Sequence, residues 1–240
     1  IEFYYSHPLH PDPFTHGNDI QRQNGTWYVH RNGKKASNNP NCGQRRGIDL
    51  TIGDGNSCGG ILFRAIQPLA GGPMIEGPIK VVQHMAQALH LNINDLRELD
   101  SAICDREVIS TNCQVMIEEL PQNMSCTLPI LKTPRGGLTF NKIEESSFQS
   151  ALGFILAPYR FIAHPESTEK YPQILAAVLH RDGATTQQIQ DQSTLSPKMI
   201  ERVKSAFEKG HINGMRSLPE LIQSWDEYSI CEVLGAQANK

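Results

Sequence analysis

The stretch at residues 44–67 reads Gln-Arg-Arg-Gly-Ile-Asp-Leu-Thr-Ile-Gly-Asp-Gly-Asn-Ser-Cys-Gly-Gly-Ile-Leu-Phe-Arg-Ala-Ile-Gln. Apolar residues alternate with polar ones at 48, 50 and 52, a Gly-Asp-Gly turn follows at 53–55, and a second apolar segment covers 61–66. This pattern predicts two β-strands joined by a tight connection.

Two charged residues, Asp49 and Arg64, lie inside these apolar segments. A charge in a buried strand is costly unless it is paired or faces a polar cleft. We therefore predict that these strands form the wall of a pocket, which Asp49 and Arg64 face.

Composition sets the outer limits on function. The chain has 240 residues and a net charge of −3, with 39% apolar and 20% charged residues, which is ordinary for a globular protein and argues against a generally basic nucleic-acid binder. The apolar runs are too short to span a bilayer, so we expect no membrane association. None of the six cysteines forms a Cys-x-x-Cys pair, which disfavours a zinc ribbon.

The N-terminal segment is predicted to be a strand at 1–5 followed by an ordered, proline-rich loop at 6–25. Its polar residues Glu2, Tyr4, Asp12 and His16 could all point into a site. The alternative is a surface loop that only connects two elements.

A strand is predicted at Thr26–Arg31, and a segment without acidic residues follows it up to Arg46. Five cations are spaced there among Asn, Gly and Ser; they are Arg31, Lys34, Lys35, Arg45 and Arg46. Positive charge on a flexible loop suits contacts with phosphate groups. The alternative is a solvated loop with no ligand.

Helical periodicity dominates after residue 165. A first helix starts earlier, at Gly77-Pro78, and four more are predicted between 171 and 230, the third of them ending at Gly210. The helix–short helix–helix order from 172 to 210 is typical of a helix-turn-helix module. We favour a packing role over a DNA-reading role, because the third helix has few basic residues where base contacts would arise.

Four segments, taken in order, resemble the alkyladenine (3-methyladenine) DNA glycosylase family over residues 1–163. They are Asp12-x-x-x-His16 with Gly25-Thr26-Trp27-Tyr28-Val29; Ile48-x-Leu50 with Gly53-Asp54-Gly55 and Ile61–Leu69; Gly77-Pro78-Ile79-Lys80-Val81-Val82-Gln83; and Thr133-Pro134-Arg135-x-Gly137 with Pro158-Tyr159-Arg160-Phe161. No single segment is specific, and the resemblance rests on their order and spacing.

The resemblance implies an α+β fold, in which a mixed domain at 1–165 has a curved antiparallel β-sheet flanked by helices. A helical C-terminal subdomain at 166–240 lies outside it. The implied activity is hydrolysis of a purine N-glycosidic bond in a nucleic acid, with adenine as the expected base, by a monomer without metal or cofactor. The implied compartment is the nucleus or cytoplasm for a repair enzyme, while the first residue, Ile1, leaves secretion open.

The resemblance also assigns site residues. His16, Tyr28, His30 and Arg64 correspond to positions around the base, and Asp49 stands where the family has an asparagine that screens the base. Two registers are open for the catalytic glutamate: in one Glu2 activates water, and in the other Tyr4 occupies that place. Asp49 and Asp12 are the fallback carboxylates.

The chain departs from the family after the pocket strand. The family has a short hairpin there with a tyrosine that wedges into duplex DNA, whereas this chain has the longer basic segment 31–46, without aromatic residues. We therefore expect a purine that is already unstacked, in single-stranded DNA or an RNA loop. Two alternatives remain open, a catalytically silent nucleic-acid-binding protein on the same scaffold and a nucleoside or nucleotide hydrolase.

Overall fold

A computed structural model describes residues 1–31, 46–91, 99, 102–103, 108–109, 113–119, 129–141 and 143–238. The chain divides into two compact units, Ile1–Thr127 and Leu128–Lys240, and each is considered by itself below. The boundary predicted at 165/166 lies inside the second unit, so this unit contains strands as well as helices. No helix among the described residues is long and apolar enough to cross a membrane.

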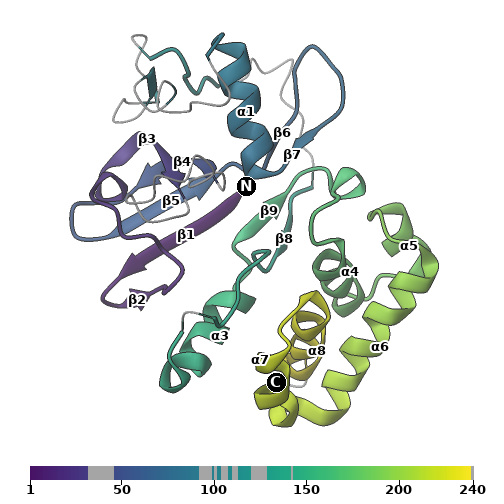
Figure 1. Cartoon of the computed structure of the whole chain (residues 1–240). Helices are drawn as coiled ribbons and strands as arrows, with labels where there is room; N and C mark the ends of the chain where they lie inside the picture. Colours follow the sequence, from purple (N-terminus) through teal and green to yellow (C-terminus); the bar gives the residue numbers. More distant parts are fainter. Residues whose placement is uncertain are drawn as a thin grey trace, which may run out of the picture. The chain divides into compact units, whose positions relative to one another are not determined.

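The first unit is built around an antiparallel sheet with the strand order β3-β4-β5-β1 (Figure 1). Strand β2 pairs with the C-terminal end of β1, at Ser6 and His7. Its elements are β1 (Glu2–His7), β2 (His10–Pro11), the 3-10 helix η1 (Asp19–Arg22), β3 (Asn24–Arg31), β4 (Arg46–Ile52), β5 (Cys58–Leu62), β6 (Ala65–Ile66), β7 (Ile75–Glu76) and α1 (Pro78–Ala88). The first strand predicted from residues 44–67 is β4. The second, predicted at 61–66, is divided: β5 starts earlier and ends at Leu62, and Ala65–Ile66 forms β6 in a separate two-stranded sheet with β7. Strands β4 and β5 pair antiparallel.

Side chains alternate between the two faces of this sheet. One face presents Trp27, Val29, Ile48 and Leu50 to helix α1, whose Val81, Val82 and Ala86 are buried against them. Helix α1 begins at Pro78, as the sequence predicts. Proline suits this first position because a backbone N–H there would have no partner within the helix. The opposite face, which we call the polar face, carries the residues that alternate with this core.

The second unit combines a short antiparallel pair of strands, β8 and β9, with a bundle of helices (Figure 1). Its elements are β8 (Leu131–Thr133), η2 (Glu145–Ser147), α3 (Phe148–Leu156), β9 (Arg160–Ile162), η3 (Pro165–Ser167), α4 (Pro172–Arg181), α5 (Thr186–Asp191), α6 (Pro197–Asn213), η4 (Gly214–Ser217), α7 (Leu218–Gln223) and α8 (Glu227–Gln237). The described residues are thus of the α+β class, with an antiparallel sheet and flanking helices.

The third predicted helix, α6, does not end at Gly210, because it continues to Asn213. A Cβ at Gly210 would meet the backbone carbonyl of Glu232 in α8, and a Cβ at Gly235 would meet the backbone of Phe207 in α6. The two glycines therefore let α6 and α8 approach backbone to backbone. The sequence pattern predicts a helix end at Gly210, whereas the role of this glycine is close packing.

Candidate functional site

The polar face of the first unit brings together residues from four strands. The pairing register aligns Tyr28 of β3 with Asp49 of β4, Asp49 with Leu62 of β5, and Leu62 with Glu2 of β1. These four residues form one row across the sheet. Neighbouring strands lie about 4.8 Å apart, so the Cα atoms of Glu2 and Asp49 are separated by about 10 Å.

Glu2 is buried, with 5% of its surface exposed, and it forms an ion pair with Arg64. The Arg64 Nη1 atom lies 3.4 Å from Glu2 Oε2, and 15% of the Arg64 side chain is exposed. The pair compensates part of the cost of burying the carboxylate and fixes its orientation. Arg64 is one of the two charges that the sequence predicts to face a pocket, and its partner is Glu2.

Asp49 is fully buried and accepts a hydrogen bond from Tyr4, whose Oη lies 2.7 Å from Asp49 Oδ2. Gln21 Nε2 in turn donates to Tyr4 Oη at 2.6 Å. Burial, and then the negative charge of Asp49, raises the pKa of Tyr4 well above its ordinary value of 10. Tyr4 is therefore a neutral hydrogen-bond donor at physiological pH rather than a base.

Gly60 explains how Tyr4 of β1 reaches Asp49 of β4, which is two strands away. In the register Tyr4 lies opposite Gly60 of β5, and Gly60 lies opposite Thr51 of β4. A Cβ on Gly60 would collide with Tyr4 Oη and would lie 2.6 Å from Tyr4 Cζ. The tyrosine ring thus lies across β5 over the space that the missing side chain leaves.

Gln21 belongs to the site, although it is not among the site residues that the sequence predicts. Its side-chain Oε1 accepts a hydrogen bond from the backbone N–H of Asn18, and Asn18 caps η1 in return. An Asn followed three residues later by Gln is the sequence signature of a capping box. That signature could have identified a fixed Gln21, but not its bond to Tyr4.

The other predicted site residues, His16, Tyr28, His30 and the fallback carboxylate Asp12, differ in their burial and position. Tyr28 is buried on the polar face, whereas His16 is exposed in the loop before η1. Asp12 is buried, and its Oδ1 accepts a hydrogen bond from the backbone N–H of Phe14, which is a turn-forming contact within its own loop. His30 lies in β3 opposite Gly47, and its side chain is outside the described residues.

The predicted phosphate-binding segment is described only at its ends. Arg31 and Arg46 face each other in the register of β3 and β4, with side chains outside the described residues, and Lys34, Lys35 and Arg45 are outside them altogether. Phosphate binding by this segment stays a prediction.

Among the described residues there is no group of three or more His, Cys, Asp or Glu side chains that could hold a metal ion. The polar face offers a carboxylate held by a guanidinium, a second carboxylate held by a phenol, and two tyrosine rings. Such a set can accept a proton, orient a water molecule and contact an aromatic ring.

Comparison with known proteins shows a distant similarity to a viral protein. A 100-residue alignment is 30% identical to the uncharacterized protein L759 of Acanthamoeba polyphaga mimivirus and covers 36% of this chain. The aligned part is 45% of the viral protein, so the chain spans less than half of that relative's length. No family model and no solved structure matches the chain. The resemblance to the alkyladenine DNA glycosylases stays a prediction.

Proposed function

We propose that the protein is a purine N-glycosidase, with adenine as the expected base, which acts on a nucleic acid. The observation that carries this proposal is the buried Glu2 carboxylate, held by Arg64 in the same cross-strand row as Asp49 and Tyr28. A water molecule must be activated next to the sugar, and a carboxylate with a fixed orientation is suited to that task.

In the proposed reaction Glu2 takes a proton from water, and the water oxygen forms a bond to the sugar C1′ atom. The C1′–N bond to the purine breaks, its electron pair leaves with the base, and the base nitrogen takes up a proton. Arg64 acts as a positioning residue through its ion pair with Glu2. The rings of Tyr4 and Tyr28 contact the base, and Asp49 keeps Tyr4 in place through their hydrogen bond.

Between Glu2 and Tyr4, the geometry favours Glu2 as the general base in this proposal. Tyr4 donates a hydrogen bond to Asp49, and its raised pKa keeps the phenol protonated at neutral pH. Glu2 is the carboxylate paired with a partly exposed arginine, and it is therefore the group that we assign to water activation.

The test measures free adenine by liquid chromatography after incubation with single-stranded DNA, duplex DNA, an RNA loop and adenosine. We expect release from the single-stranded substrates and a loss of about 10²- to 10⁴-fold in Glu2→Gln, which is the usual contribution of a general base. Asp19→Asn is the matched control, because it removes one negative charge from an exposed position of the same unit.

The substrates also separate the alternatives. Release from adenosine alone would indicate a nucleoside hydrolase, and binding of nucleic acid without any release would indicate a silent binding protein. Full activity in a correctly folded Glu2→Gln variant would show that Glu2 is not the base.

A further inference from the structure

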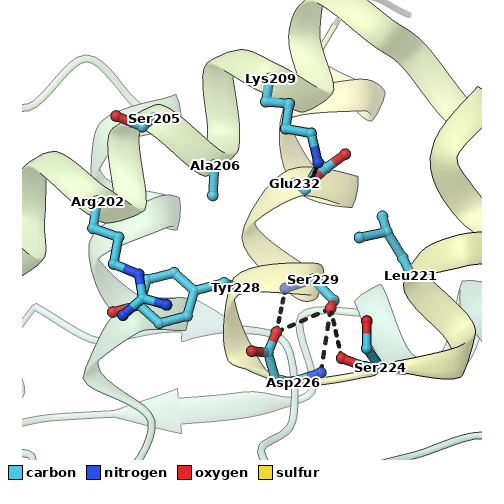
Figure 2. A pocket seen from close by; sticks show the side chains of 10 residues that line it. All are labelled: Arg202, Ser205, Ala206, Lys209, Leu221, Ser224, Asp226, Tyr228, Ser229 and Glu232. Carbon is cyan, nitrogen blue, oxygen red and sulfur yellow. Dashed lines mark hydrogen bonds and ion pairs between the residues drawn. The ribbon is translucent and has the colours of Figure 1, made fainter.

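The second unit contains a pocket of about 420 Å³ among α6, α7 and α8 (Figure 2). Arg202, Ser205, Ala206 and Lys209 line it from α6, at spacings of three, one and three residues that place them on one helix face. Small-molecule sites have volumes of about 300–1,000 Å³, so the pocket is large enough for an organic ligand.

Arg202 lies against the ring of Tyr228, and both residues line this pocket (Figure 2). Its guanidinium carbon is 4.1 Å from the ring centroid. In the part of the chain that the structure describes, no carboxylate lies within ion-pair distance of Arg202. A guanidinium stacked on an aromatic ring keeps its in-plane N–H groups available, and these match the oxygen atoms of a phosphate.

The two carboxylates that line the pocket already have partners. Glu232 is buried and lies 2.9 Å from Lys209 Nζ. Asp226 Oδ1 accepts hydrogen bonds from the backbone N–H and the hydroxyl of Ser229, as the cap of α8. The formal charges of the lining residues balance, and Arg202 is the lining cation whose guanidinium is not held in an ion pair by either of these carboxylates.

We propose that this pocket binds the phosphate group of a phosphoester of nucleotide size, with Arg202 as the phosphate ligand. Leu221 and the edge of Tyr228 supply apolar surface for the organic part of the ligand. The exposed Lys198 precedes Arg202 by four residues on α6, so a second phosphate of a polymer would meet it on the same helix face. This site lies outside the polar face of the first unit and goes beyond the proposed hydrolysis.

The first experiment is calorimetric titration of the full chain with AMP, adenosine and inorganic phosphate. We expect AMP to bind at least ten times more tightly than adenosine, which lacks the phosphate. Arg202→Gln should weaken AMP binding about 10- to 100-fold, the usual effect of losing a charged hydrogen-bonding partner. Arg202→Lys should also weaken it, because an ammonium group cannot bind two phosphate oxygens side by side.

Arg181→Gln is the matched control, because it removes an arginine of the same unit that pairs with Asp182 outside the pocket. Its AMP affinity should equal that of the wild type. Equal affinities for AMP and adenosine, wild-type affinity in Arg202→Gln, or no binding of AMP at millimolar concentration would each overturn the proposal. Far-UV circular dichroism confirms that the variants are folded.

A second experiment identifies the source of the phosphate, using fluorescence anisotropy of a labelled ten-nucleotide single strand. If Lys198→Gln weakens the oligonucleotide and leaves AMP unchanged, the pocket holds one phosphate of a polymer. If AMP binds and the oligonucleotide does not compete, its ligand is a free nucleotide. Neither measurement depends on base release, so loss of adenine release in Glu2→Gln with unchanged AMP binding separates the two proposals.

Discussion

The arrangement of Tyr4 over Gly60 predicts a strong coupling between these two positions. In Gly60→Ala the new methyl group would collide with the Tyr4 hydroxyl, so the ring must move and its bonds to Asp49 and Gln21 are lost. Overpacking costs about 1–3 kcal/mol. The lost bonds around a buried charge cost about 1–3 kcal/mol more. We expect Gly60→Ala to lower the free energy of unfolding by about 3–4 kcal/mol.

Tyr4→Phe alone should cost about 1–3 kcal/mol, because the hydroxyl and both of its hydrogen bonds are removed. In the double variant this loss has already occurred, so the two effects should not add. We expect the double variant to be at least about 1 kcal/mol more stable than the sum of the single effects predicts.

The assay is urea denaturation followed by the fluorescence of Trp27, which is buried in the first unit. The second tryptophan, Trp225, belongs to the other unit, so all variants are made in a Trp225→Phe background. Tyr5→Phe is the control, because Tyr5 lies on the opposite face of β1 and is only half-buried; its effect should be within about 0.5 kcal/mol. Additivity of Gly60→Ala and Tyr4→Phe within about 0.5 kcal/mol would refute the arrangement.

Two further predictions concern pH and helix packing. The raised pKa of Tyr4 means that the unfolded chain releases this proton first, so the stabilisation is fully present below pH 10 and is lost as the pH rises above it. Alkaline denaturation curves should therefore fall more steeply above pH 10 for the wild type than for Tyr4→Phe, by at most about 1.4 kcal/mol per pH unit, and parallel curves would contradict this. Gly210→Ala should destabilise the second unit by about 2–4 kcal/mol in thermal melts, because its methyl group meets the backbone of Glu232. Gly153→Ala in α3 is the control: its methyl group would enter open space, and it should stabilise the unit by up to about 1 kcal/mol. Equal effects of the two substitutions would show that α6 and α8 do not approach closely at Gly210.

Much of the local structure follows from the sequence alone. Alternation at 48–52 predicts β4, the apolar segment at 61–66 predicts a strand that the structure divides between the end of β5 and β6, and proline at position 78 with the apolar spacing after it predicts α1. Helix α3 was not predicted, although its buried residues Ala151, Leu152, Ile155 and Leu156 fall at helical spacing on one face. Composition predicts a boundary at 165/166, whereas the density of contacts divides the chain at 127/128.

The sequence by itself determined that Asp49 and Arg64 are charges within apolar segments, and that Glu2 and Tyr4 share one face of the first strand. Only the tertiary structure decided their partners: Arg64 pairs with Glu2 across 62 positions, and Tyr4 bonds Asp49 across 45. The reason is that a local pattern fixes the face on which a side chain lies, whereas strand register and the gap at Gly60 fix which distant side chain it meets.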